Sequence, residues 1–445
     1  MKLSCKLAYS FGAIATALSY QAFATYIIFY YVDTIKLTPY LAALGMLIYA
    51  IWNAINDPIA GYVSDHTHSR WGRRLPYIAV GAIPLGLFFY LIWCPPFTEY
   101  SQVFPLFLYF TATICLFDGF YTITVLNWSS LFPEMFPSLA ERSQVNALRQ
   151  MFAMIGLCLG LVLPPLIFSL FGWGTMGLIL GAVIAAAFLV ALWGSHEHLE
   201  FSREKQLTLW PSFKASLQNR SFLTFALANL LVQYAFTLLL ATTPFFVKYV
   251  LRLNAEFTAL VLGAAFLVAI PMLFVWEPVV MKVGAKKAYL AAIACLASAL
   301  LPLAIVQNFG ATLLTALFIG VGIAGWLLLS DVLLADVIDE DETRTGTRRE
   351  GLYFGLNSFI SRLAIVLEAL SIGYVFTNRG YNPYVYTQPT DFLSGLRWLI
   401  AWLPILALGL TFILLLFYPL FGQRLLDMES RVAKIHDKKG VTEHG

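Results

Sequence analysis

The feature of this sequence that most constrains its fold is a series of long apolar segments separated by short polar gaps. A bilayer core about 30 Å thick needs roughly 20 consecutive apolar residues in each helix that crosses it. Twelve segments reach that length, at residues 7–31, 40–63, 75–94, 103–126, 145–170, 174–194, 221–250, 255–276, 288–307, 309–335, 351–376 and 392–418. We therefore predict an all-α membrane protein with twelve transmembrane helices.

The amino-acid composition excludes a water-soluble fold. Hydrophobic residues make up 60% of the chain and charged residues 12%, against about 45–50% and 25% in soluble domains. The net charge of +3 is small, so we expect no nucleic-acid partner. The sequence has no Walker loop or zinc signature and offers no convergent nucleophile and base, so we expect neither a cofactor nor an enzymatic activity.

The distribution of basic residues predicts how the chain crosses the membrane. Lys and Arg gather at both termini and in the even-numbered gaps, as with Arg73 and Lys287, whereas the opposite gaps hold few, such as Lys36. Because basic loops stay on the cytoplasmic side, we place both termini in the cytoplasm and the protein in the cell (inner or plasma) membrane, as a multi-pass protein.

The longest polar gap divides the chain into two sets of six segments. Residues 1–194 and 221–420 are predicted to form two six-helix bundles, joined by a cytoplasmic loop at 195–220 and followed by a cytoplasmic tail at 421–445. A weak repeat supports this division, because Asp57-Pro58 and Glu277-Pro278 each precede a glycine-basic cluster at equivalent cytoplasmic ends. Transporters with repeated halves have this organisation.

Three acidic residues, Asp57, Asp118 and Glu368, lie deep in apolar segments, where a charge costs at least about 2.5 kcal/mol and needs a partner or a cavity. Asp57 follows Asn53 by four residues, and Asp118 precedes Thr122 by four, so each pair shares a helical face. Their oxygen atoms can surround Na⁺ or share a proton. We predict a cation-coupling site from these four residues. The alternatives are an ion pair of Asp57 with Arg149 or a loop base, and a structural hydrogen bond for Asp118.

Two arginines inside apolar segments are candidates for solute contact. Arg149 and Arg362 come from opposite halves, and a guanidinium group offers several donors in a fixed fork to a hydroxylated or anionic solute. The alternative is that each extends its charged end toward the cytoplasm. Glu368 lies six residues after Arg362, about 240° around the helix, so it needs a different partner.

Aromatic and amide side chains beside polar positions extend the candidate solute site. A flat ring with a hydrogen-bonding group suits a sugar, although aromatic belts at the membrane interface use the same residues. The candidates are Tyr20, Tyr121, Trp128, Trp326, Tyr353 and Asn357.

Charged residues at the predicted cytoplasmic ends form a further group. An acidic run from Asp336 to Glu342 lacks the spacing of a Ca²⁺ loop and favours a solvated charge network between helices. We expect this network to control conformational change. Its predicted members are Asp65, Arg70, Arg73, Arg74, Asp336, Asp339, Arg348 and Arg349.

Two stretches resemble the glycoside-pentoside-hexuronide:cation symporter family, the melibiose-carrier branch of the major facilitator superfamily. The first reads WNAINDPIAG at 52–61 and continues to SRWGRR at 69–74. The second reads LADVID at 334–339, followed by TG at 345–346 and RREG at 348–351. The resemblance runs from KLAY at 6–9 through the eleventh segment. It implies a major-facilitator-type fold, alternating access and cation coupling.

The resemblance also assigns roles to individual residues. Asp57 and Thr122 match two members of the family's cation site, but Asn53 stands where a further acid is expected. Na⁺ near Asp57 is then the one metal that the pattern allows. Because an Asp57–Asp118 carboxyl pair in a low dielectric favours a bound proton, we expect H⁺ coupling in preference to Na⁺.

Other positions bear on the solute. Arg149 matches the arginine near the sugar, and Arg362 stands where a lysine is usual. The acids that bind melibiose-type sugars are replaced by Ala17 and Val125, which indicates a different solute.

The sequence thus predicts a secondary active transporter that couples a cation to uptake of a sugar, glycoside or related polar solute. A lysophospholipid transporter of the same fold is the alternative, and a non-transporting membrane sensor is a weaker one. The expected partners are the solute and the lipid bilayer, and we expect a monomer.

Overall fold

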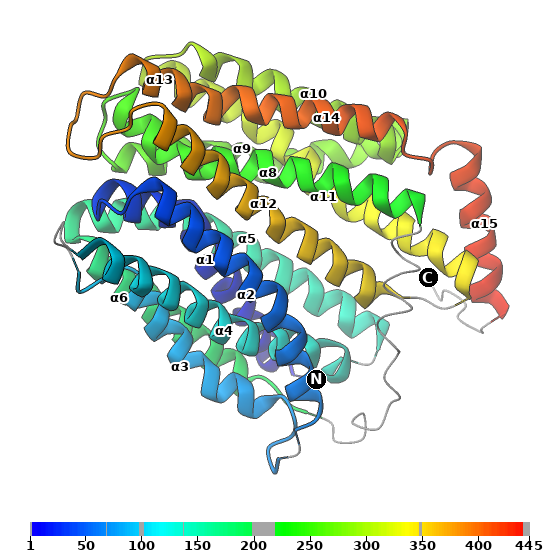
Figure 1. Ribbon diagram of the computed structural model, residues 1–445. Helices are drawn as coiled ribbons and strands as arrows, with labels where there is room; N and C mark the ends of the chain where they lie inside the picture. Colours follow the sequence, from blue (N-terminus) through cyan, green and yellow to red (C-terminus); the bar gives the residue numbers. More distant parts are fainter. Residues whose placement is uncertain are drawn as a thin grey trace. The chain divides into compact units, whose positions relative to one another are not determined.

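The computed structural model describes residues 2–67, 69–97, 102–136, 138–197, 219–346 and 349–438. The fold over these residues is all-helical, as predicted (Figure 1). The elements are α1 (Leu3–Ile28), η1 (Phe29–Thr34), α2 (Pro39–Asp65), α3 (Leu75–Ile92), α4 (Val103–Met135), α5 (Leu139–Phe171), α6 (Trp173–Trp193), α8 (Arg220–Tyr249), α9 (Glu256–Val283), α10 (Ala285–Leu300), η4 (Leu301–Ala304), α11 (Phe309–Thr345), α12 (Glu350–Asn378), α13 (Thr390–Arg397), η5 (Trp398–Trp402), α14 (Leu403–Leu416) and α15 (Gln423–Lys438).

Eleven helices among the described residues are long and apolar enough to cross a membrane. The prediction of twelve differs at α2, which has 27 residues but is not among the eleven. The reason lies in its sequence, because Asn53, Asn56 and Asp57 interrupt the apolar run that begins at Leu41. Helix α2, which falls short of the other spans, carries two of the predicted cation-coupling residues, Asn53 and Asp57.

Local signals in the sequence set where several helices begin and end. The Asn308 side chain accepts a hydrogen bond from the Ala311 backbone N–H at 2.9 Å, which caps the start of α11. Gly346 ends the same helix in the left-handed conformation, at φ 71°, which glycine adopts without steric cost. Ser138 caps α5 in the same way, through the Glu141 N–H.

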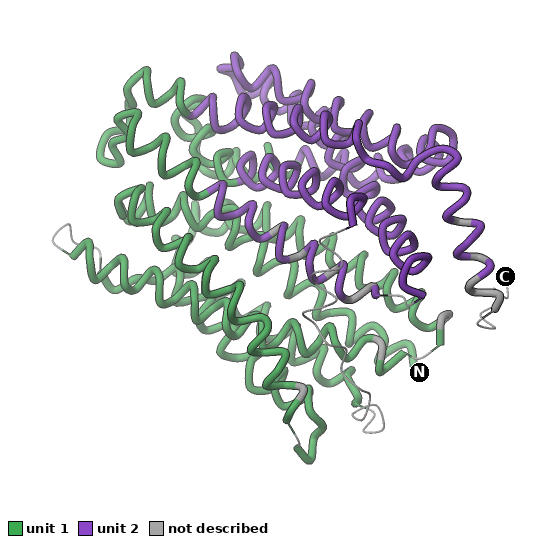
Figure 2. Tube along the Cα trace, turned by 45° about the vertical axis from the view of Figure 1, so that its right-hand side comes forward, with its two compact units in different colours: residues 1–205, 241–263, 369–395 green, residues 206–240, 264–368, 396–445 purple. Residues whose placement is uncertain are grey.

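The chain folds into two compact units (Figure 2). Unit 1 comprises residues 1–205, 241–263 and 369–395. In it α1 packs against α5 and α6, α3 against α4 and α6, and α2 against α4. Close packing of α1 on α5 depends on Gly156, since a Cβ atom there would lie 2.5 Å from the Ile14 carbonyl oxygen.

Unit 2 comprises residues 206–240, 264–368 and 396–445. In it α10 packs against α11 and α14, and α11 also packs against α15. Small residues bring α10 and α11 together, because a Cβ atom on Gly322 would lie 2.6 Å from the Leu296 Cα. Helices α8, α9 and α12 each contribute residues to both units.

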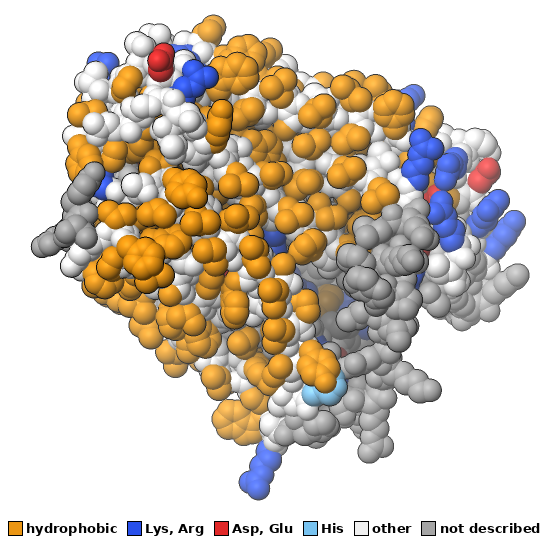
Figure 3. Space-filling model, in the orientation of Figure 1, with side chains coloured by type: hydrophobic (Ala, Val, Ile, Leu, Met, Phe, Trp, Pro, Cys, Tyr) orange, Lys and Arg blue, Asp and Glu red, His pale blue; other side chains and the backbone are white. Residues whose placement is uncertain are grey.

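The outer surface matches a lipid environment. Leu267, Phe274 and Met281 on α9 are exposed and recur every seven residues, so they form one apolar stripe along the helix. Figure 3 shows hydrophobic side chains over most of the visible surface, with Lys and Arg gathered over α15. This separation of apolar helices from charged ends is what a protein in a bilayer requires.

Candidate functional site

The predicted cation-coupling residues lie on helices α2 and α4, where hydrogen bonds join them in two neighbouring groups, one around Asp118 and one at Asp57. Asn53 Nδ2 donates to Asp118 Oδ1 at 2.6 Å, and Asn56 Nδ2 donates to Asp118 Oδ2 at 3.3 Å. One turn further along α4, Thr122 Oγ1 donates to Asp57 Oδ1 at 2.8 Å. Asn53, Asn56, Asp118 and Thr122 are buried, and Asp57 is half-buried. The structure therefore brings together the four residues that the sequence singled out.

Each carboxylate in this cluster has donors of its own. Two amide groups donate to Asp118, and an ionised carboxylate is an acceptor only, so this arrangement suits the charged form. The sequence analysis missed Asn56, although it follows Asn53 by three residues and so shares its face. Among the residues the structure describes, no three His, Cys, Asp or Glu side chains converge to hold a metal ion.

Arg149 on α5 lies against a group of aromatic rings within unit 1. Its guanidinium carbon is 4.6 Å from the centre of the Trp128 ring and 4.7 Å from that of Phe132. Trp128 stacks on Tyr9 at 5.3 Å between ring centres. The indole N–H donates to the Tyr9 carbonyl at 3.0 Å, so this polar group has a structural role. Trp128 therefore offers its ring face to Arg149 rather than its N–H to a solute.

The other aromatic candidate residues of unit 1 also meet. The rings of Tyr20 on α1 and Tyr121 on α4 lie 6.4 Å apart between centres. Phe117 lies 6.0 Å from Tyr121 on the same side of α4. The structure thus brings together two of the predicted solute-contact residues, Tyr20 and Tyr121.

Unit 2 holds a second polar cluster. Asn229 Nδ2 on α8 donates to Asn357 Oδ1 on α12 at 2.8 Å, and the Trp326 indole N–H approaches Asn229 Oδ1 at 3.5 Å. Trp326 and Asn357 were predicted from the sequence, whereas Asn229 was missed because both of its neighbours in the sequence are apolar. Tyr353 is fully buried, with its ring packed edge-on against Phe222. Its ring therefore contributes to the core of unit 2.

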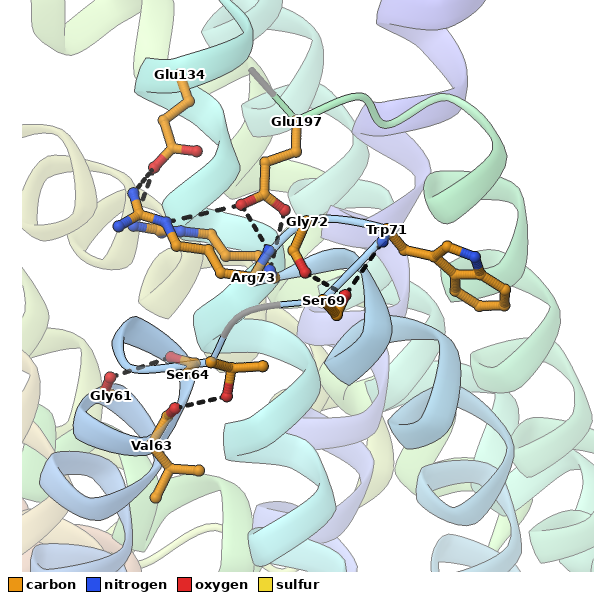
Figure 4. Close-up of polar contacts among 11 residues, drawn as sticks. Gly61, Val63, Ser64, Ser69, Trp71, Gly72, Arg73, Glu134 and Glu197 are labelled. Atoms are coloured by element: carbon orange, nitrogen blue, oxygen red, sulfur yellow. Dashed lines mark hydrogen bonds and ion pairs between the residues drawn. The ribbon is translucent and has the colours of Figure 1, made fainter. Parts of the chain in front are cut away.

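The basic loop after α2 binds two acids, Glu134 and Glu197, that the sequence analysis did not select (Figure 4). The backbone N–H groups of Arg73 and Arg74 donate to the two Glu197 carboxylate oxygens at 2.9 and 3.0 Å. Both guanidinium groups also contact Glu134 Oε1, at 2.6 and 3.0 Å. Arg70, predicted to join them, is exposed, and the Asp65 side chain lies outside the described residues.

The acidic run at the end of α11 is buried, which corrects the prediction of a solvated network. Glu340, Asp341 and Glu342 are at most 5% exposed. Arg424 reaches Glu340 Oε1 from α15 at 2.9 Å, so the C-terminal helix helps to cover the run.

Arg349, another predicted base of this network, binds the acidic run. It pairs with Asp341 through two hydrogen bonds, at 2.7 and 2.5 Å. These bonds raise the pKa of Arg349 above its ordinary value. Asp336 and Asp339 lie on the same helix, α11, and Arg348 lies outside the described residues.

Comparison with known proteins identifies the family. Residues 8–421 match the family described as MFS/sugar transport protein. The chain belongs to this family. It is therefore a multi-pass membrane transporter of small solutes and not an enzyme, and the resemblance to the glycoside-pentoside-hexuronide:cation symporters is confirmed.

Relatives of this transporter carry different names. An uncharacterized symporter of Synechocystis sp. is 26% identical, with 94% of each chain covered. The isoprimeverose transporter of Lactiplantibacillus pentosus is 25% identical, over 96% of this chain and 92% of the relative. The sodium-dependent lysophosphatidylcholine symporter 1-A of Danio rerio is 22% identical, over 94% and 86%.

A solved structure confirms the fold of this MFS transporter. The crystal structure of the nucleoside transporter NupG superposes with a TM-score of 0.64 at 13% sequence identity. The match covers 94% of this chain and 98% of that chain. The all-α, major-facilitator-type fold predicted from the sequence is thus confirmed.

The transporter has a further buried acid that the sequence analysis missed. Asp33 in η1 is 2% exposed. Its carboxylate accepts from Lys248 Nζ at 2.5 Å and from the Tyr381 hydroxyl at 2.9 Å, and the Tyr249 hydroxyl also donates to it. All four residues belong to unit 1, although Asp33 comes from the first half of the sequence and the other three from the second.

Lys36 adds a second link at the same place. Its Nζ donates to the carbonyl oxygens of Asp33 and Pro383. Burial lowers the pKa of Lys36 below its ordinary value, although the Asp33 carboxylate acts in the opposite direction. The sequence signals for this cluster are Asp33, which follows the first apolar segment, and Lys36 and Lys248, which lie at gaps that hold few basic residues.

We predict that Asp33→Asn destabilises the protein. The substitution leaves the Lys248 ammonium without its counter-charge, and two tyrosine hydroxyls lose a charged acceptor. Because Lys248 is partly exposed, the expected cost is roughly 1–3 kcal/mol. Thermal unfolding in nanodiscs should show a lower melting temperature. Asp391→Asn, which changes an exposed acid, is the control, and an Asp33→Asn melting temperature equal to that of the control would contradict the assignment.

Proposed function

We propose that this protein couples the inward movement of a cation, H⁺ in preference to Na⁺, to the uptake of a sugar, glycoside or related polar solute. We further propose that it works as a monomer by alternating access, with six-helix halves at 1–194 and 221–420 and both termini in the cytoplasm. The sequence relatives named as symporters and as a sugar transporter support this assignment.

The polar cluster in unit 2 is the observation that carries the choice of a polar solute. Asn229 and Asn357 place amide groups beside the Trp326 ring within otherwise apolar helices. Buried amides in hydrocarbon are retained where they line a site or bind one another. Amide groups together with an indole ring are the chemistry that recognises sugar hydroxyls and the apolar face of a sugar.

Arg149 supports the same choice from unit 1. The Arg149 guanidinium group lies over the Trp128 and Phe132 rings, and its donors are fixed in one plane. That geometry suits a hydroxylated or anionic solute. Arg362 lies in unit 2, and its contact with the solute remains part of the proposal.

The contacts of Asn53 support H⁺ over Na⁺. A Na⁺ site needs oxygen atoms that converge on the ion. In this protein an amide NH₂ group points at the Asp118 carboxylate, at 2.6 Å, and a second one from Asn56 approaches the other oxygen. Amide hydrogens thus occupy the side of the carboxylate that a cation would need.

A lysophospholipid remains the second candidate solute, because one relative is named as a lysophosphatidylcholine symporter. The replacement of sugar-binding acids by Ala17 and Val125 is compatible with an amphiphile. Uptake assays distinguish the two candidates directly.

We expect purified protein in proteoliposomes to accumulate a radiolabelled polar solute when the outside is acidic and Na⁺ is absent. Isoprimeverose, a methyl glucuronide and lysophosphatidylcholine should be tested with pH and Na⁺ gradients imposed separately. Accumulation of either sugar under the pH gradient supports the proposal. Accumulation under the Na⁺ gradient alone, or of the lysolipid alone, would refute it.

We predict that Arg149→Lys weakens solute binding more than it weakens folding. Lysine keeps the charge but loses the planar group that stacks on Trp128 and donates several hydrogen bonds. The apparent affinity for the transported solute should fall about tenfold or more, which corresponds to roughly 1.4 kcal/mol. Arg70→Lys, in an exposed loop, is the matched control. Equal affinity in both variants would remove Arg149 from the solute site.

A further inference from the structure

One acid in the membrane-spanning helices has no charged partner among the described residues. Glu368 on α12 is 1% exposed. Neither of its carboxylate oxygens has a hydrogen-bond partner within normal geometry in the described part of the chain. It lies ten residues before the end of α12 at Asn378, or about 15 Å along the helix axis, which places it well inside the hydrocarbon.

This environment differs from that of every other buried acid described above. Asp33 has an ammonium group and two phenols, Asp118 has two amides, and Asp57 has a hydroxyl. An ionised carboxylate without such donors is expensive in a low-dielectric interior, and a group in that position binds a proton instead. The burial and isolation of Glu368 therefore favour the neutral acid.

One polar side chain lies beside the Glu368 carboxyl. Thr237 on α8 interacts with the Glu368 carboxyl, and no charged side chain in the described residues does. The Thr237 hydroxyl donates to the Tyr234 carbonyl at 3.3 Å. Since its hydrogen is used there, its oxygen remains able to accept. A protonated Glu368 supplies the donor that this oxygen lacks.

We propose that Glu368 is a proton-binding site of this transporter and that it carries the coupled H⁺. This inference rests on the proposed function. In the conformation described here the carboxyl is protonated and hidden. Transport requires a conformation in which water reaches Glu368, where the O–H bond breaks, the proton leaves to water and the carboxylate stays charged. Rebinding of a proton is then needed before the side chain can be buried again.

The polar contacts and the titrating group lie in different halves of the sequence. Asp118 and Asp57 keep their own donors and shape the polar contacts of α2 and α4, while the titrating group lies on α12. Thr237 is the positioning residue, because it orients the carboxyl through its oxygen. Glu368→Gln keeps the size and a donor but cannot release a proton, so it separates binding from coupling.

A direct test is infrared difference spectroscopy on purified protein in nanodiscs, between neutral and strongly alkaline pH. We expect wild type to show the carbonyl stretch of a protonated, buried carboxylic acid at neutral pH, and Glu368→Gln to lose it. Glu277→Gln, at an exposed position on α9, is the matched control and should keep the band. Thr237→Val should keep the band at a shifted frequency, because the acid loses its acceptor.

Solute uptake provides the second arm. The solute is first identified with the proteoliposome panel. Vesicles that contain Glu368→Gln should then accumulate no more solute under a pH gradient than they do without one. They should still exchange internal for external solute. The inference would be overturned if Glu277→Gln lost the infrared band and Glu368→Gln kept it. Full solute accumulation by Glu368→Gln would also overturn it. Wild-type accumulation driven by Na⁺ alone would instead overturn the proposed H⁺ coupling, whatever the spectra show.

Discussion

The cost of an ionisable side chain inside hydrocarbon is the constraint on which the rest of this structure depends. It explains why each buried acid has a specific environment. Asp33 is neutralised by Lys248, Asp118 accepts from two amides, and Asp57 accepts from a hydroxyl. Glu368 has none of these donors. The same cost therefore explains why the first three acids have hydrogen-bond donors, and it favours a neutral carboxyl at the fourth.

The constraint also shapes the helices around these groups. Glycines allow neighbouring spans to pack closely, as Gly156 does on Ile14 and Gly322 does on Leu296. At the helix ends, where water is near, the chain uses full ion pairs instead, such as Arg73 with Glu134. The polar groups inside the spans are thus hydrogen-bonded, and the charged groups at the helix ends form ion pairs.

Much of this arrangement could be predicted because it depends on spacing along one helix. The apolar segments predicted the helices, and the four-residue spacings placed Asn53 with Asp57 and Asp118 with Thr122. The apolar signal is weaker at α2, where Asn53, Asn56 and Asp57 interrupt the segment, and this helix is not among the eleven candidate spans of the described residues. The prediction was wrong for the acids after Asp336, which it treated as solvated, whereas α15 helps to cover them.

Other features depend on contacts between segments far apart in the sequence, and no local pattern reports them. Asn229 has apolar neighbours in the sequence, and its contacts with Asn357 and Trp326 form only in the folded protein. Asp33 becomes notable only when Lys248 and Tyr381 reach it. Glu368 was recognised as deep in its segment, but its isolation is a property of the folded environment. The roles assigned to these residues remain predictions for experiment.

The most direct test of this division among the buried acids is their reaction with dicyclohexylcarbodiimide, which partitions into membranes and adds to protonated carboxyl groups. Labelled protein at neutral pH would be digested and mapped by mass spectrometry. Charged and paired acids should stay unmodified, so we predict the adduct on Glu368, decreasing as the pH is raised, and none on Asp33 or Asp118. An adduct on Asp118 with none on Glu368 would contradict the view that the proton is held on α12.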